Sequence, residues 1–425
     1  MNKENQFDVT IIGAGPAGVV AASLLQQKGW SVCILERELF PRFSIGESLL
    51  PHCTEILEEA NLLDAVVKNQ KTLGFQFKNG AMFHRDGVDC SFDFTKKFSK
   101  GPGTTFQVKR ANFDKLLADE VEKQGVTIRY QHSVTAFDST DTGTTLSVTS
   151  PTGDYQLQAK FTLDASGFGR VLPRLLNLEK DSELLSRTAI FTHIKDNLPS
   201  TEKGKQFDRD KILITVHPTK PDVWYWLIPF SDGTASVGVV GENSYFDNPE
   251  TEQALNNTLR GYLNEDANLS ELLTNAEVIA PVRKIGGYSA NVTSLYGKRY
   301  ALLGNSGEFL DPVFSSGVTI AFHSALLAAN TLHKDLSDEQ VSWEDEFAIP
   351  LASGVETFKH FVMAWYDTVL QNIIFFTDND SEVKAMICSI LAGYAWDESN
   401  PYATKTKRRL ATLAEICQEE NDHAI

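Results

Sequence analysis

A glycine-rich turn between a strand-like run and a helix-like run constrains the fold of this chain more than any other feature. A mostly apolar run leads into Gly13, Gly15 and Gly18 of GAGPAG, and the following residues have helical periodicity. A second apolar run ends at Glu36, about 20 residues beyond the glycines, as in dinucleotide-binding βαβ units. Glycines let a backbone approach a pyrophosphate at the helix start, and Glu36 can accept hydrogen bonds from a ribose diol. The sequence therefore predicts a Rossmann-like domain that binds a dinucleotide.

Composition narrows the class of protein further. The 425 residues are 42% hydrophobic and 22% charged, which is typical of a globular protein large enough for several domains. No apolar run reaches the length of about 18 residues that spans a bilayer, and the N-terminus does not resemble a secretory signal, so we expect a soluble, cytoplasmic protein. Five cysteines without a Cys-x-x-Cys pair argue against a disulfide framework and a metal site. A formal charge of −17 argues against binding to nucleic acid.

Three further segments indicate which dinucleotide is bound. VKRANFDKLLADEV places Arg110 at the start of a helix, FTLDASGFGR is a strand ending at Asp164, and residues 299–330 give a strand, a loop and a long helix. These segments resemble those that hold FAD in flavoproteins of the aromatic-hydroxylase type. Because no second glycine fingerprint for NAD(P)H is present, we expect FAD as the cofactor and a separate reductase as the source of reduced flavin.

The order of these segments predicts a discontinuous domain organisation. β-rich stretches with period-two alternation and many aromatic residues lie between the FAD segments, as expected of a sheet that covers a substrate cavity. The predicted fold class is α/β, an FAD-binding Rossmann-like domain with an inserted, mostly antiparallel substrate sheet and a helical C-terminal region. The predicted bounds are 1–70, 104–180 and 283–335 for the FAD-binding domain, 71–103 and 181–282 for the sheet, and 336–425 for the helical region.

Four segments spread over most of the chain resemble the flavin-dependent halogenases. They are the glycine turn, FPRFSIGESLLP (40–51), Trp224-x-Trp226-x-Ile228-Pro229 and FLDPVFSSG (309–317). The resemblance is to the tryptophan halogenase superfamily, in its phenol- and pyrrole-processing branch. The glycine turn is shared by many flavoproteins, whereas the paired tryptophans are close to diagnostic for the family. Without the other segments, two indoles on one strand face would be read as core filling.

The resemblance implies an oxidoreductase in which different groups oxidise the halide, separate the flavin from the substrate and deliver the halogen. Reduced FAD (FADH2) and dioxygen give a C4a-hydroperoxide, which oxidises chloride or bromide to hypohalous acid. Trp224 and Trp226 would separate the flavin from the organic substrate, which would otherwise be hydroxylated. Lys78 matches the family's catalytic lysine and would deliver the halogen to an aromatic ring. It lies among alternating apolar residues, which favours a cavity-facing ammonium over a solvated surface lysine.

The predicted site residues fall into three further groups. The expected cofactor contacts are Gly13, Gly15, Ala17, Gly18, Glu36, Arg37, Ser48, Arg110, Asp164, Asn305 and Asp311. Backbone N–H groups at Ser316 and Gly317 would face the halide. Phe75, Phe77 and Phe314 would line the substrate pocket. The chain departs from its relatives at Asn305, where many flavoproteins have an aspartate, and at Phe314, where tryptophan-specific halogenases have a glutamate.

The missing glutamate favours an electron-rich phenol or pyrrole as substrate over free tryptophan. The ring could be free or tethered to an acyl or peptidyl carrier protein. The basic run KTKRR (405–409) is either a solvated helix end or a docking patch for such an acidic partner. Two other functions remain open, an FAD-dependent aromatic hydroxylase and a flavin-dependent reductase of isoprenoid double bonds. A flavin-binding protein that has lost its catalytic activity is a further alternative.

Overall fold

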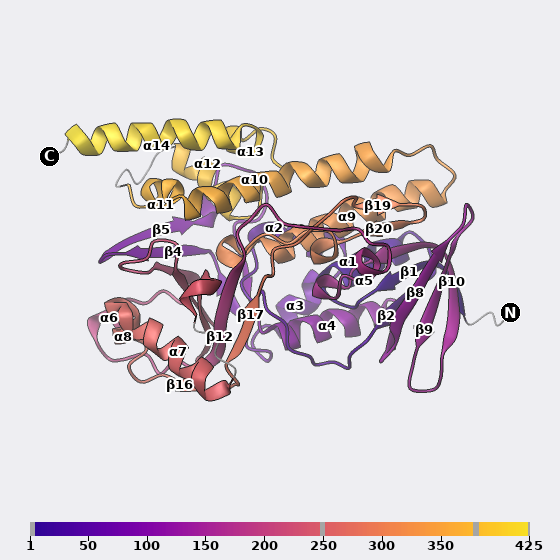
Figure 1. Cartoon of the computed structure of the whole chain (residues 1–425), viewed down its shortest axis with the longest axis horizontal. Helices are drawn as coiled ribbons and strands as arrows, with labels where there is room; N and C mark the ends of the chain where they lie inside the picture. Colours follow the sequence, from indigo (N-terminus) through magenta and orange to yellow (C-terminus); the bar gives the residue numbers. More distant parts are fainter. Residues whose placement is uncertain (1–4, 247–250, 377–381, 424–425) are drawn as a thin grey trace.

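The computed structural model describes residues 5–246, 251–376 and 382–423. They form two large sheets, and the C-terminal helices lie across the top of both in the view of Figure 1. Among the described helices, none combines the length and the apolar character needed to cross a membrane. The predicted fold class is confirmed, since a parallel Rossmann-type sheet, a mostly antiparallel second sheet and a helical C-terminal region are all present.

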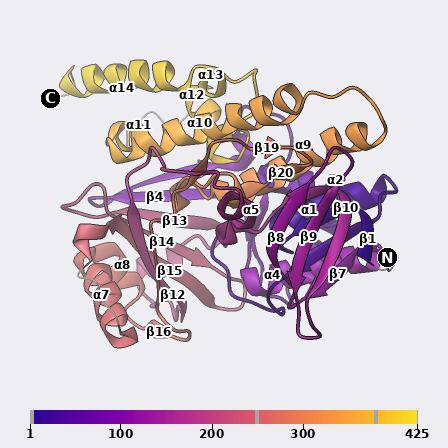
Figure 2. The same ribbon diagram turned by 45° about the vertical axis from the view of Figure 1, so that its right-hand side comes forward.

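The first sheet carries the predicted dinucleotide-binding unit. Its main path runs β19-β20-β10-β1-β2-β7, and β1 pairs in parallel with both β2 and β10. The strands β8, β9 and β10 extend it toward the viewer in Figure 2. The strand β2 is buried over its whole length, which agrees with its continuously apolar sequence up to Glu36. The strands are β1 (Gln6–Ile12), β2 (Val32–Glu36), β7 (Thr127–Tyr130), β8 (Ser133–Ser139), β9 (Thr144–Thr149), β10 (Tyr155–Asp164), β19 (Tyr296–Gly297) and β20 (Tyr300–Leu302).

Six helices accompany this sheet. The helix α9 packs along α1, which brings residues from the last third of the chain beside the glycine turn. The helices are α1 (Pro16–Gln27), α2 (Pro51–Glu59), α3 (Leu63–Asn69), α4 (Arg110–Lys123), α5 (Val171–Leu175) and α9 (Ser316–Leu336).

The two faces of the second sheet pack into different hydrophobic cores. Its path is β16-β12-β15-β14-β13-β4-β5, with β17 paired to β12, and only β13 and β4 run in parallel. Trp224 and Trp226 of β14 belong to the core shared with the first sheet, whereas Tyr225 and Leu227 pack into a separate core with α7 and α8. The elements are β4 (Gly80–Arg85), β5 (Val88–Asp93), β12 (Arg187–Lys195), β13 (Lys211–Val216), β14 (Trp224–Pro229), β15 (Thr234–Glu242), β16 (Glu277–Val278), β17 (Arg283–Gly286), α6 (Glu202–Gln206), α7 (Glu252–Glu265) and α8 (Ala267–Leu272).

Two short two-stranded sheets join these parts. One pairs β3 (Gln76–Lys78) with β6 (Thr105–Gln107), and the other pairs β11 (Glu179–Lys180) with β18 (Asn291–Val292). The structure differs from the predicted bounds at β17, which pairs with β12 although the sequence assigned residues 283–286 to the FAD-binding part.

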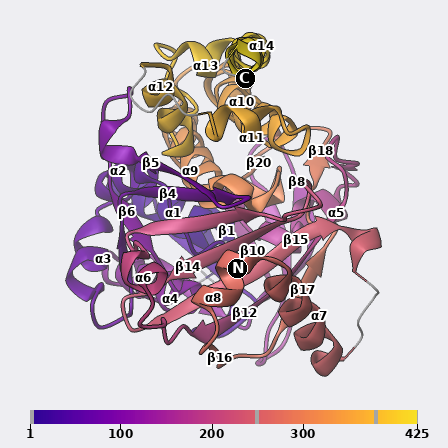
Figure 3. The same cartoon turned by 90° about the vertical axis from the view of Figure 1, so that its left-hand side faces the viewer.

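The C-terminal helices form a layer over both sheets, seen from the side in Figure 3. The layer is the predicted helical region, and it follows α9 through a single π-helical turn at Glu344–Ala348. Its helices are α10 (Ile349–Tyr366), α11 (Val369–Ile374), α12 (Glu382–Leu391), α13 (Pro401–Thr404) and α14 (Thr406–His423).

Candidate functional site

The glycine turn is packed tightly on one side and open on the other. Gly13 has φ of +98°, and a Cβ atom there would lie 2.6 Å from the carbonyl oxygen of Ala165. A Cβ atom on Gly18 would lie 2.0 Å from the carbonyl oxygen of Gly13, so this glycine lets α1 pack against the turn. At Gly15 a Cβ atom would meet only Arg42, at 3.6 Å. The turn therefore leaves room above Gly15 for a ligand to approach the backbone.

Two backbone N–H groups fix the side chain of Glu36 at the end of β2. Its carboxylate accepts hydrogen bonds from the N–H of Ala14 over 2.9 Å and from the N–H of Glu38 over 3.0 Å. The residue is 4% exposed and lines the cavity described below. Arg37 also lines that cavity, and its side chain is largely exposed beside Glu38. A carboxylate fixed in this way retains lone pairs for the hydroxyls of a ribose.

Arg42 is a candidate phosphate contact that the sequence interpretation missed. Its guanidinium lies over Gly15 and between two carboxylates, 3.7 Å from Glu36 and 3.2 Å from Asp114. The only signal was its place in FPRFSIGESLLP. Arg110, which was predicted, forms a two-point ion pair with Asp114 and also donates to backbone carbonyls of the same FPRFSIGESLLP segment. Arg110 therefore braces that segment as well as facing the cavity.

A single cavity of about 870 Å³ joins these groups to the second sheet. The predicted cofactor contacts that line it are Gly13, Gly15, Ala17, Glu36, Arg37, Ser48, Arg110 and Asn305. Its far end is formed by side chains of the second sheet and by the start of α9, including Ala189, Phe191, Ile212, Trp224, Trp226, Ile228, Ser315 and Gly317. A pyrophosphate-binding turn, a ribose acceptor and a long apolar end together fit an FAD molecule.

Three predicted cofactor contacts lie behind the cavity wall. Gly18 packs against the glycine turn, as described above. Asp164 is fully buried and accepts hydrogen bonds from Ser166, Leu172 and Ser306, so it fixes the DASG loop from behind. Asp311 is 3% exposed and is bonded to tyrosine hydroxyls. Burial raises the pKa of Asp164, and it raises the pKa of Asp311 to about 6.

The paired tryptophans form a rigid part of the cavity wall. Trp224 and Trp226 are 1% and 4% exposed, their rings are 5.9 Å apart, and both line the cavity. The indole of Trp226 donates to Ser236 over 3.1 Å. Its cross-strand neighbour is Gly238, where a Cβ atom would lie 2.4 Å from the indole. The absence of a side chain at Gly238 therefore makes room for the ring of Trp226.

Lys78 lies directly behind the cavity wall. It is 0% exposed, and its Nζ donates to Oγ of Ser48 and to the carbonyl of Leu49, both over 2.8 Å. Nζ also lies 5.4 Å from the ring centre of Phe94. Burial lowers the pKa of Lys78 from 10.5 to about 7. Because Ser48 itself lines the cavity, a single residue separates the lysine from the space that fits FAD.

The three phenylalanines predicted to line a substrate pocket do not line this cavity. Phe75 is 2% exposed and packs on Phe113. Phe77 is 41% exposed, because the alternation of β3 that buries Lys78 turns its neighbour outward. Phe314 belongs to the turn Pro312–Phe314 and packs on the C-terminal helices. The phenylalanines and the tyrosine that do line the cavity were not predicted, and they are Phe43, Phe168, Phe191, Tyr288 and Phe309.

The start of α9 offers an anion-binding geometry at the far end of the cavity. Ser315 has φ of +57° and precedes the helix, and both Ser315 and Gly317 line the cavity. Ser316, the other predicted halide contact, is 1% exposed and does not contribute to this wall. The first N–H groups of a helix carry a positive end of the helix dipole, which suits a monovalent anion.

Comparisons with known proteins agree with this geometry. Residues 6–260 match the FAD binding domain family. A Pseudomonas fluorescens chlorinase of pyrrole-2-carbonyl groups on a peptidyl-carrier protein is 27% identical, over 85% of this chain and 84% of that protein. A tryptophan 2-halogenase of Chondromyces crocatus is 30% identical, over 80% of this chain and 63% of that protein. The crystal structure of a flavoprotein/dehydrogenase from Cytophaga hutchinsonii is 42% identical, covers 98% of this chain and 100% of its own, and has a TM-score of 0.91.

Proposed function

The chain belongs to the FAD binding domain family and is related to flavin-dependent halogenases, and from this premise we propose that it halogenates an electron-rich aromatic ring. The observation that carries the proposal is the burial of Lys78 directly behind Ser48 on the wall of the flavin cavity. A hydroxylase that brings its substrate to the flavin has no need of a desolvated amine in that place.

The cavity supplies the oxidising half of the reaction. Bound FAD, once reduced by a separate flavin reductase, provides the chemistry by which dioxygen converts chloride or bromide to hypohalous acid. The backbone N–H of Gly317, which lines the cavity at the start of α9, would hold the halide there, because the N–H of Ser315 already donates to the carbonyl of Pro312. Trp224 and Trp226 would keep the organic substrate away from the flavin and so prevent hydroxylation.

Lys78 supplies the delivery half of the reaction. With the pKa of its amine lowered to about 7, a large fraction of Lys78 is neutral near pH 7 and carries a nucleophilic lone pair. That lone pair can attack the halogen of hypohalous acid, forming an N–X bond as hydroxide leaves and takes up the amine proton to give water. An aromatic ring then attacks the halogen, the N–X bond breaks with its electron pair returning to Nζ, and the proton lost from the ring restores the amine. After the N–X bond forms, Nζ keeps one N–H, and its bond to Ser48 or Leu49 would aim the halogen at one ring carbon.

A pH dependence follows from the state of this amine. We expect the rate of product halogenation to rise with pH through a midpoint near 7, because protonation of Lys78 removes the lone pair. Oxygen consumption by the reduced enzyme, measured in the same assays, should not follow this profile. A rate of halogenation that is flat or falls between pH 6 and 8 would remove the neutral amine from the mechanism.

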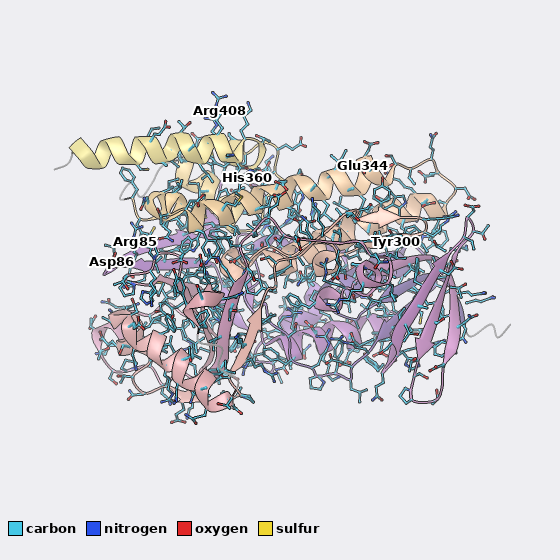
Figure 4. The ribbon with its side chains drawn as sticks, viewed as in Figure 1. Arg85, Asp86, Tyr300, Glu344, His360 and Arg408 are labelled. Atoms are coloured by element: carbon cyan, nitrogen blue, oxygen red, sulfur yellow. The ribbon has the colours of Figure 1, made fainter. Side chains whose placement is uncertain are left out.

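The substrate class that the chain favours is a phenol or a pyrrole. No carboxylate occupies position 314, so the ring itself must be electron-rich enough to attack the halogen. The chlorinase of Pseudomonas fluorescens acts on a pyrrole carried by a protein, which makes a tethered ring one form of the proposal. Lys405, Lys407 and Arg408 line a groove of about 700 Å³ that also carries Glu356 and Glu398, and these three cations would contact an acidic carrier. Arg408 and His360 of this groove are labelled in Figure 4.

The proposal is tested by product analysis in the presence and absence of halide. The protein, FAD, a flavin reductase and NADH are incubated with phenolic, pyrrolic and carrier-bound pyrrolic rings in chloride, bromide or halide-free buffer. Halogenated products, identified by mass spectrometry, are expected only with halide, with little or no benzo-ring halogenation of free tryptophan. A hydroxylated product without halide would favour the aromatic hydroxylase, and anaerobic reduction of an isoprenoid double bond would favour the reductase.

A further inference from the structure

A chain of buried hydrogen bonds behind the cavity wall joins residues from distant parts of the sequence. The indole N–H of Trp224 donates to Oη of Tyr366 over 3.0 Å, and Tyr366 donates to Oδ2 of Asp311 over 2.9 Å. The hydroxyl of Tyr288 also points at this oxygen, over 3.5 Å. Trp224 and Tyr288 both line the cavity. This series of hydrogen bonds therefore connects two aromatic side chains of the cavity wall.

The chemistry of the three side chains fixes which group donates and which accepts in each hydrogen bond. An indole can only donate and an ionised carboxylate can only accept, so the hydroxyl of Tyr366 must accept from Trp224 and donate to Asp311. Trp224 and Asp311 are 1% and 3% exposed, and buried polar groups such as these need a hydrogen-bond partner. Phenylalanine at position 366 would fill the same space and remove both bonds at once.

The same carboxylate organises the turn at which the halide is proposed to bind. Oδ1 of Asp311 accepts the N–H of Val313 over 3.0 Å and so begins the turn that leads to Ser315 and Gly317. One side chain therefore holds the start of α9 with one oxygen and, through Tyr366, holds Trp224 with the other. A change in the position of the indole is thereby linked to the turn.

Tyr366 is the main side-chain partner of Asp311, because the nearby cation does not bond to this carboxylate. Arg187 of β12 lies with its guanidinium 3.5 Å from the ring centre of Tyr366 and pairs with Asp222, so it reaches Asp311 only as a nearby charge. The groups that face Asp311 are therefore Arg187 from β12, Tyr366 from α10 and Tyr288 from the loop after β17. Loss of the Tyr366 donor would raise the pKa of Asp311 further.

We propose that Tyr366 is a positioning residue that locks the Trp224 indole to the turn before α9, so that the flavin compartment stays closed to the substrate while a halide is bound. This role in separating the compartments rests on the function proposed above. It gives the C-terminal helical layer a part in the chemistry, because Tyr366 is the last residue of α10.

The test compares Tyr366→Phe with Tyr225→Phe. Tyr225 is a buried tyrosine on the same strand as Trp224, but its hydroxyl bonds to Tyr262 on the opposite face of the sheet. We expect Tyr366→Phe to raise the hydrogen peroxide or hydroxylated product formed per halogenated product by about tenfold, with FAD affinity unchanged. Tyr225→Phe should leave this ratio at the wild-type value. An unchanged ratio in Tyr366→Phe, or an equal rise in both variants, would overturn the proposal.

A second measurement does not depend on turnover. In protein labelled with 15N-tryptophan, the indole resonance of Trp224 is assigned as the signal missing from Trp224→Phe among those of the six tryptophans. In the wild type and in Tyr225→Phe it should shift with pH near 6, as Asp311 takes up a proton, and in Tyr366→Phe this titration should vanish. A Trp224 signal that does not respond to pH in the wild type would overturn the proposed link even if the protein proves to be a halogenase.

Discussion

Replacement of Lys78 by methionine is expected to lower the rate of product halogenation by about 10²-fold or more while FAD binding and oxygen consumption persist. The halide would still be oxidised in the cavity, but hypohalous acid would be neither captured nor aimed. Lys78→Arg should fail in the same way, because a guanidinium keeps the positive charge and lacks a nucleophilic lone pair. Product is measured by mass spectrometry and oxygen consumption by an electrode in the same reaction.

Stability measurements separate this catalytic role from a structural one. A buried ammonium is costly, so an apolar side chain of similar size should leave the melting temperature equal or higher at pH 7. Since folding lowers the pKa of Lys78 from 10.5 to about 7, the unfolded chain binds more protons between these pH values, and the stability of the wild type should rise with pH across that window. Lys78→Met should lack this rise, and Lys68→Met, at a largely exposed lysine, should behave as wild type.

A folded, FAD-loaded Lys78→Met protein that still halogenates one ring position would exclude Lys78 from delivery. A variant that fails to fold would instead indicate that the bonds from Nζ to Ser48 and Leu49 hold the loop before α2 in place.

Sequence alone could predict those parts of the site that local spacing determines. The glycine turn and Glu36 follow from a βαβ unit that is continuous in the chain. The common orientation of Trp224 and Trp226 follows from the period of a strand. The same reasoning does not extend from Phe77 to Phe83, because the chain leaves one small sheet after Lys78 and enters another sheet at Gly80, so one alternating pattern covered two unrelated strands.

The remaining features depend on contacts that no local pattern reports. Tyr366 and Trp224 are 142 positions apart, and Lys78 of β3 and Ser48 of the segment before α2 are 30 positions apart. Arg42 lies over the glycine turn only because the segment that follows β2 brings it beside Gly15 and Glu36. Phe314 follows Pro312 in a tight turn, and which way such a turn directs its last side chain is set by the helices packed against it.

Gly15→Val is expected to abolish FAD binding without disturbing the fold of the protein. Gly15 has φ of −76° and ψ of −175°, an extended conformation that valine adopts readily, so the substitution introduces no backbone strain. A Cβ atom there meets only the guanidinium of Arg42, at 3.6 Å, and the rest of the side chain would occupy the space through which a pyrophosphate approaches the turn. FAD affinity is measured by equilibrium dialysis or flavin fluorescence, and folding by circular dichroism of the protein freed of cofactor.

Substitutions at two other glycines are the controls that distinguish a loss of FAD binding from a loss of stability. Gly18→Ala places a Cβ atom 2.0 Å from the carbonyl oxygen of Gly13, so it should destabilise the protein with or without FAD. Gly261→Val lies in α7, where a Cβ atom meets nothing within 4 Å, and should bind FAD as the wild type does. The cofactor-free melting temperature should therefore separate Gly18→Ala from the other two variants, whereas FAD binding should separate Gly15→Val from Gly261→Val. If Gly15→Val binds FAD as tightly as Gly261→Val, the pyrophosphate does not lie over this turn and the assignment of the cavity to FAD is wrong.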